Sequence, residues 1–238
     1  MANMRGFARW HIWLGWLAGV PLVLWSLSGL VMVAKSNDEV RGEHLRRALA
    51  PAALPAGTDI SVRLPADRAR PVVAVATQVE GGRVITRLSY ADKRIERYDA
   101  QGRRLAPLSD VEARLLVAER IVGGDDVASV ALTDPQAPPL DFRRPVAAWQ
   151  VTLGDGTRVY VARDSGEIAA VRTRWWRIYD FFWGLHIMDL QTREDTHHPI
   201  LILFAALASA SSLLGTVLLF RRRKARPRAP RRRDRTHQ

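Results

Sequence analysis

Three histidines and several carboxylates lie together in the segment 185–199, "LHIMDLQTREDTHHP", directly before a long apolar segment. Neutral imidazoles combined with carboxylates suit Zn, Fe or Cu ions, and histidine is the usual axial ligand of a b-type haem. The segment therefore offers donors for a transition metal or for haem. The residues available for a metal ion are His186, Asp189, Glu194, Asp195, His197 and His198.

A fourth histidine, His11, stands at the beginning of the first apolar segment. About 30 Å of hydrocarbon would separate His11 from the other three histidines, so they cannot all bind one iron. A haem would need His11 from two copies of the chain, or His186 with His197 or His198. The alternative is that His11 belongs to an aromatic belt with its neighbouring tryptophans.

The histidine-rich segment also has a purely structural interpretation, as the polar start of a membrane helix. Asp195 and Thr196 can cap the first turn of that helix, and Pro199 suits its opening position. Negative charge is favourable at this end of the helix dipole. Because the spacing of the histidines matches no established metal motif, both interpretations stay open.

Two apolar segments are long enough to cross a membrane. Residues 11–34 form an uncharged run of 24 residues, and residues 199–220 form one of 22. At about 1.5 Å per residue, either helix can cross a hydrocarbon core of roughly 30 Å. The first run is longer than the core of a signal peptide and no small-x-small cleavage site follows it, so it predicts an uncleaved anchor.

Charge at the two ends predicts the orientation. The tail 221–238 holds ten Arg or Lys residues and one Asp, hence nine of the twelve net positive charges, and Arg5 and Arg9 lie in residues 1–10. Short basic flanks stay in the cytoplasm, which places the middle of the chain outside. We interpret the basic tail as a topology signal that contacts anionic lipid, rather than as a nucleic-acid-binding segment.

The region between the apolar segments has the pattern of an α+β domain. Residues 35–56 are rich in Ala and Pro and predict a linker or a short helical stalk. Residues 57–174 contain two groups of three short β-rich runs separated by turns, which predict two antiparallel meanders and suggest a duplication. Between them, Ser109 and Glu112 have capping-box spacing and begin a predicted covering helix. Its expected apolar stripe consists of Val111, Leu115, Ala118 and Val122.

Two further predictions concern the membrane. Residues 175–190 are aromatic but too charged to span, which favours a helix lying in the outer interface. Small residues spaced by four favour close helix packing, within one chain or in a homodimer. These packing residues are Gly15, Gly19, Ala208 and Ser212.

The sequence resembles a known family at both ends and over roughly residues 105–220. "WQVTLGDGTRVYVARDSGEIAAV" (149–171) resembles the strand-turn-strand core of PepSY domains. "RWHIWLGWLAGVPLVLWSLSGLVMV" (9–33) and the region from "WGLHIMDL" to "SLLGTVLLF" are similar to the PepSY-associated transmembrane family. The resemblance implies a bacterial inner-membrane protein with a periplasmic PepSY-like domain.

Longer relatives resemble haem-bearing reductases of iron acquisition, and soluble PepSY domains occur in protease propeptides. This chain has two predicted spans and no Gly-rich nucleotide loop, which disfavours a complete reductase. It has no Cys and no Gly-x-Ser-x-Gly or His-Glu-x-x-His motif, so hydrolase chemistry is disfavoured too. We expect a non-catalytic accessory protein of envelope or iron uptake with a periplasmic or membrane protein partner. The alternatives are a haem or metal redox component and a membrane-held restraint on a periplasmic protease.

Overall fold

The two apolar segments form the long helices α1 (Ala2–Met32) and α5 (Pro199–Lys224). The computed structural model describes residues 2–50, 52–67 and 69–224. α1 begins nine residues before the predicted start at residue 11, because the arginines ahead of the apolar run are good helix formers. For the same reason α5 continues past residue 220 into the basic segment.

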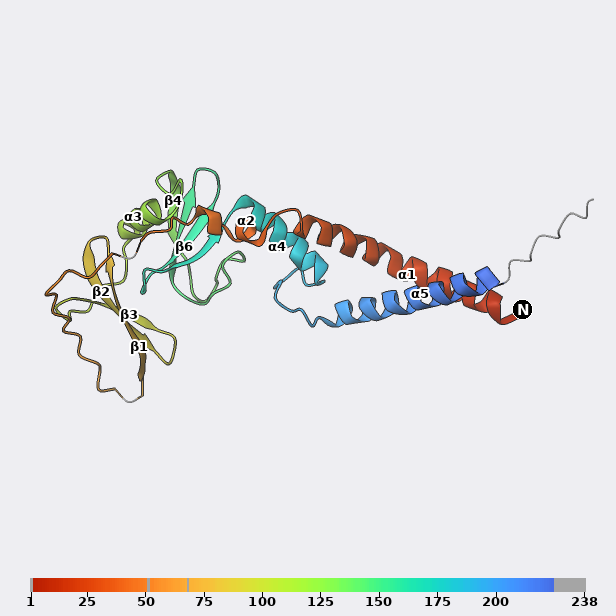
Figure 1. The fold of residues 1–238 in the computed structure, drawn as a ribbon, viewed down its shortest axis with the longest axis horizontal. Coiled ribbons are helices and arrows are strands. Elements are labelled where there is room, and N and C mark those ends of the chain that lie inside the picture. The colour runs from red at the N-terminus through yellow and green to blue at the C-terminus, as the bar shows by residue number, and fades with distance from the viewer. Residues whose placement is uncertain (1, 51, 68, 225–238) are drawn as a thin grey trace, which may run out of the picture. The chain divides into compact units, whose positions relative to one another are not determined.

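The chain divides into two compact units, and the first consists of residues 1–34 together with 180–238. In this unit α1 and α5 lie side by side and antiparallel (Figure 1). Their large apolar side chains are mostly exposed; Trp13 is 72% and Leu213 68% exposed. Both helices are long and apolar enough to cross a membrane. Apolar side chains on every face are the pattern of helices surrounded by lipid.

The second unit, residues 35–179, contains two antiparallel sheets, as the sequence predicted. The first sheet has three strands in the order β1-β2-β3, and the second has four in the order β4-β5-β6-β7. In each sheet neighbours along the chain are neighbours in space, because short turns join the strands. The strands are β1 (Val72–Glu80), β2 (Arg83–Tyr90), β3 (Ile95–Asp99), β4 (Val127–Leu132), β5 (Ala148–Leu153), β6 (Arg158–Ala162) and β7 (Ile168–Arg172).

The sequence predicted only three strands for the second sheet, and the additional strand β4 was not predicted. Its residues, "VASVAL", directly follow a Gly-Gly-Asp-Asp stretch, and a long irregular segment separates them from β5. β4 pairs with β5 in a register that shifts between Val127 and Ser129. Since only Val127 and Val130 pack on the core, the strand lacks a strict alternation that could have revealed it. The two sheets thus differ in strand number, and a duplication stays a prediction.

The covering helix α3 (Asp110–Arg120) forms where the sequence predicted it, and its capping box is confirmed. The Glu112 amide donates to Ser109 Oγ (3.2 Å), and Glu112 Oε2 accepts from the Ser109 amide (2.9 Å). The predicted buried face was wrong. Ala113 and Val117 are fully buried against the four-stranded sheet, whereas Val111 and Leu115 are 57% and 66% exposed.

The segment 35–56, predicted as a linker or short helical stalk, contains short helices and is partly folded onto the second sheet. It holds α2 (Asn37–Arg41) and the short 3₁₀ helix η1 (Glu43–Leu45). Val40 is buried, Leu45 packs on the core, and Arg46 forms a β-bridge with Ile121. Gly42 joins the two helices with a positive φ of 71°. A Cβ there would lie 2.7 Å from Val171, so the close approach requires glycine.

The predicted interfacial helix is α4 (Arg174–His186), four residues shorter at its end than the expected 175–190. It stops at His186 because the chain turns back: Met188 has a positive φ of 59°, and the Asp189 amide donates to the Gly184 carbonyl (2.9 Å). Within the second unit, Trp176 is buried beneath the Arg172 guanidinium, which lies 4.2 Å from its ring centre. At least this aromatic side chain therefore packs on protein rather than facing lipid.

Candidate functional site

His186, the last residue of α4, is held against the C-terminal turns of α1. Its Nδ1 lies 3.0 Å from Ser28 Oγ, and its ring centre lies 5.3 Å from that of Trp25. Ser28 is fully buried and also donates to the Trp25 carbonyl (2.8 Å). The imidazole also lies close to Gly29, where a Cβ would make ordinary van der Waals contact with His186 Cε1 at 3.5 Å. Burial lowers the pKa of His186 below its ordinary value of 6.5.

Asp189 organises the loop that follows His186, and both of its carboxylate oxygens are used. Oδ1 accepts the amides of Gln191 (3.2 Å) and Thr192 (3.0 Å). Oδ2 accepts the Thr192 hydroxyl and the amides of Glu194 (3.1 Å) and Asp195 (3.2 Å). These hydrogen bonds, the Thr192 hydroxyl foremost, hold the pKa of Asp189 far below its usual range. Asp189 therefore serves as the internal anchor of this loop rather than as an open metal ligand.

An ion pair closes the same loop onto α4. Arg193 Nη1 lies 2.6 Å from Asp180 Oδ2, and both side chains are mostly buried. The Trp183 indole donates to the Arg193 carbonyl (3.0 Å). A Cβ at Gly184 would lie 2.7 Å from Arg193 Cγ and 2.8 Å from the Asp189 carbonyl, so glycine allows the loop to approach the helix. The polar segment is thus a folded loop, held by its own hydrogen bonds and by an ion pair to α4.

The remaining histidines lie apart from this arrangement. The His197 amide donates to Asp195 Oδ1 (2.9 Å), and the His197 Nδ1 lies 3.3 Å from Thr196 Oγ1. His198 Nδ1 is buried without a hydrogen-bond partner among the described residues. His11 packs against α5, where a Cβ at Gly215 would come within 2.9 Å of its ring.

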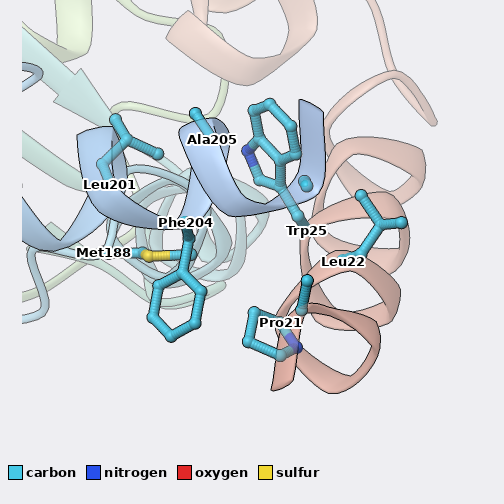
Figure 2. A pocket seen from close by; sticks show the side chains of 9 residues that line it. Pro21, Leu22, Trp25, Met188, Leu201, Phe204 and Ala205 are labelled. Carbon is cyan, nitrogen blue, oxygen red and sulfur yellow. The ribbon is translucent and has the colours of Figure 1, made fainter. Parts of the chain in front are cut away.

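His11 and His186 of one chain cannot bind the same haem. His11 and Ser28, the partner of His186, are seventeen residues apart on α1, or about 25 Å along the axis. The hollow between α1 and α5 has a volume of only about 10 Å³ and could hold at most one water molecule (Figure 2). Its lining is apolar and consists of Ala18, Pro21, Leu22, Trp25, Met188, Leu201, Phe204, Ala205 and Ala208.

The predicted metal cluster is not assembled either. Over the described part of the chain, no three His, Asp or Glu side chains come together in a way that could hold a metal ion. The physical reason is that these groups already have other partners: Asp189 binds loop amides, Asp195 binds the His197 amide and His186 binds Ser28. Pro199 is the first residue of α5, as the sequence predicted, but Asp195 accepts the amide of His197, which precedes the helix, and Thr196 Oγ1 contacts the His197 ring, so the contacts of these two residues differ from the predicted cap.

The four small residues expected at a helix contact behave differently from one another. A Cβ on Gly15 or Gly19 would meet nothing within 4 Å, so these glycines do not mediate packing between α1 and α5. Ala208 lines the tight space between the two helices, and the Ser212 carbonyl accepts the Thr216 hydroxyl (2.8 Å). A contact of Gly15 and Gly19 with a second copy stays a prediction.

A much larger hollow, of about 670 Å³, lies in the second unit. One wall is a face of the three-stranded sheet, the opposite wall is α3, and the turn 165–168 and the segment 105–108 complete it. Its lining mixes charge with apolar surface, including Ile85, Leu115 and Leu116. The charged residues are Arg46, Arg47, Arg83, Arg87, Arg97 and Arg120, with Glu80, Glu112, Glu119 and Glu167.

Sequence reasoning missed this hollow and the partner of His186. The spacing of Arg83, Ile85 and Arg87 was a usable signal, because alternate residues of a strand share one face. A strand face carrying arginines is not a core face. Ser28 carried no such signal, since a serine in a membrane segment normally bonds its own helix backbone.

A family model described as the PepSY-associated TM region matches residues 8–238. The match covers α1 from residue 8 onward, all of α5 and everything between them. A search of curated proteins found no match, and neither did a search of solved structures.

Proposed function

This chain belongs to the PepSY-associated transmembrane family, and we propose that it is a non-catalytic accessory protein of the bacterial inner membrane. In this proposal it crosses the membrane twice, with both termini in the cytoplasm and the unit 35–179 in the periplasm. That unit binds a protein partner in an envelope process, of which iron uptake is our first candidate.

The observation that carries the proposal is the contrast between the two hollows. The space between the long helices is about 10 Å³ and apolar, whereas the hollow in the second unit is about 670 Å³ and rich in charge. Ligand sites in proteins typically occupy about 300–1,000 Å³. The helices therefore suit an anchor, and the α+β unit suits recognition.

Ser165 is the serine that most resembles a candidate nucleophile, but its hydroxyl has a structural function. Ser165 is 5% exposed, and its hydroxyl oxygen accepts the Glu167 amide (3.2 Å) within a tight turn. A nucleophilic serine needs a base within hydrogen-bond distance, and no such contact of Ser165 occurs among the described residues. This arrangement supports binding rather than hydrolysis.

Orientation can be tested directly because the chain has no cysteine. Single-cysteine variants Lys93→Cys and Thr236→Cys would be treated with a membrane-impermeant maleimide in intact spheroplasts. We expect labelling at position 93 at once and at position 236 only after the membrane is permeabilised, because basic flanks stay in the cytoplasm. The reverse pattern would overturn the proposed topology.

Partner binding can be tested in growing cells with a photo-crosslinking residue at Leu115, which is exposed and lines the hollow. The matched control is Val75, an exposed apolar residue of β1 that does not line it. We expect one discrete adduct from position 115 and none from position 75. Equal yields from both positions would argue against a partner site at the hollow.

The proposed link to iron needs a physiological test. A strain lacking the chain would be grown with iron limited to a ferric source and complemented with the wild-type gene. We expect a growth defect that disappears when ferrous iron is supplied. Normal growth on ferric iron would remove the iron assignment and leave the binding function to be placed in another envelope process.

A further inference from the structure

We propose that the 670 Å³ hollow binds an acidic segment of polypeptide in which carboxylate side chains alternate with apolar ones. The inference rests on the proposed partner-binding function and specifies the chemistry of the partner. Three observations support it: a sheet face that carries no helix of its own, three arginines beyond ion-pair distance of the described carboxylates, and an alternation of charge with apolar surface.

The first observation is a sheet face that carries no helix of its own. Gln78 and Glu80 of β1, Arg83, Ile85 and Arg87 of β2, and Ile95 and Arg97 of β3 all line the hollow. In each strand these are alternate residues, so they share one face of the sheet. α3 forms the far wall but packs its buried side chains on the other sheet. The space between is therefore open to a ligand.

The second observation is an excess of positive charge. The hollow is lined by six arginines and four glutamates. Among the arginines, Arg87 pairs with Glu80. Among the glutamates, Glu112 is taken up by the capping box of α3. Within the described residues, no carboxylate lies at ion-pair distance from Arg47, Arg83 or Arg97.

Arg97 is the most constrained of these three. Its Nη2 donates to the Ala106 carbonyl (3.2 Å), while its Nε is buried and has no hydrogen-bond partner among the described residues. Burial lowers its pKa below the ordinary arginine value. A guanidinium removed from water without a full set of acceptors is destabilised, and an incoming carboxylate would supply the missing acceptor.

The third observation favours a peptide over a small anion. Ile95 lies beside Arg97 on the same strand face, and Ile85, between Arg83 and Arg87, lines the base of the hollow and is itself only 4% exposed. Leu115 and Leu116 face them from α3. An extended peptide that alternates acidic and apolar side chains places both kinds of group along such a surface, whereas phosphate would use only the arginines.

The test uses the full-length protein in mild detergent and a fluorescent decapeptide of alternating Glu and Val, followed by anisotropy. The same peptide with Gln in place of Glu is the ligand control. We expect binding of the Glu peptide and a loss of about tenfold in affinity with Arg97→Gln, because a charge-assisted hydrogen bond is removed. Arg94→Gln removes an exposed arginine outside the hollow and should leave the affinity unchanged.

A second pair of variants guards against misfolding of Arg97→Gln. Leu115 is exposed on the opposite wall, so Leu115→Glu and Leu115→Lys should both fold. We expect the Glu variant to weaken binding of the acidic peptide and the Lys variant to strengthen it. Equal effects of the two substitutions would overturn the charge argument.

The outcomes separate this inference from the proposed function. The acidic-polypeptide assignment would be overturned if the Gln and Glu peptides bound equally well. It would also be overturned if a heparin fragment bound through Arg83 and Arg97 while the peptide did not bind. A discrete crosslink from Leu115 in cells would still support a partner at the hollow. Peptide binding in detergent with the reverse topology in spheroplasts would instead overturn the periplasmic function alone.

Discussion

Ser28 in α1 and His186 at the end of α4 are joined by a hydrogen bond of 3.0 Å, although 158 residues separate them in the sequence. Ser28 is fully buried, and Trp25 packs on the imidazole one turn earlier in α1. The contact ties the end of α4 to the first long helix. It gives His186 a structural task that needs neither a metal nor a haem.

Removing this hydrogen bond should destabilise the unit formed by residues 1–34 and 180–238. We expect Ser28→Ala to lower the free energy of unfolding by about 1–2 kcal/mol, since a buried acceptor or donor loses its partner. Ser26→Ala is the matched control, because the Ser26 hydroxyl only bonds its own helix at Leu22. Thermal unfolding in detergent measures both, and equal losses would show that the histidine contact contributes nothing.

The stability of this unit should also fall on acidification. Burial lowers the pKa of His186 below 6.5, so the unfolded chain binds the proton more readily than the folded chain. The stabilisation is complete above about pH 6.5 and is lost as the pH falls through the lowered pKa. Across this pH range, the melting temperature should fall more steeply on acidification in the wild type than in His186→Gln. The difference between the two slopes should correspond to the uptake of at most one additional proton on unfolding. Identical pH profiles would contradict the assignment.

The loop after α4 should depend on one carboxylate. Replacing Asp189 with Ala removes the acceptor of four backbone amides, so hydrogen exchange should accelerate at Gln191, Thr192, Glu194 and Asp195. Glu194→Gln is the control, since no side-chain contact of that residue appears in the described structure. Mass spectrometry of exchanged peptides from 187–198 reports the difference. Unchanged protection in the Ala variant would count against the anchoring function of Asp189.

Glycines in the first unit should differ sharply in their tolerance of a methyl group. Gly184→Ala should cost about 1–3 kcal/mol, because its Cβ would overlap the Asp189 carbonyl. Gly19→Ala meets open space and should be neutral in a single chain. Chemical crosslinking of the wild type and of Gly19→Ile in the membrane then tests for a homodimer. A loss of dimer in that variant would assign Gly19 to a contact between two copies, and no change would withdraw the homodimer prediction.

The haem alternative predicts visible absorption bands, which we do not expect. Because the two long helices leave about 10 Å³ between them, protein purified from haem-replete cells should show no stoichiometric b-type bands in a reduced-minus-oxidised spectrum. His11→Ala and His186→Ala accompany the measurement. Strong bands abolished by His11→Ala would overturn this expectation and point to a haem shared between two chains.

The sequence alone was sufficient wherever the interaction is local. Apolar runs of 24 and 22 residues predict two spanning helices, because the bilayer requires that length and composition. The capping box of Ser109 and Glu112 and the turns between strands follow from hydrogen bonds only a few residues apart. Family membership could be inferred for the same reason, since short motifs around Asp164 and His186 carry it.

Only the tertiary structure decided what depends on contacts between distant segments. The buried face of α3 proved to hold Ala113 and Val117 rather than Leu115, because the sheet beneath it, not the helix pattern, selects the face. Likewise Asp189 and His186 look like ligands in the sequence, yet the loop amides and Ser28 already bind them. The arginines of the hollow come from two strands, one helix and the segment after η1, and no sequence pattern specifies that these elements enclose a common space.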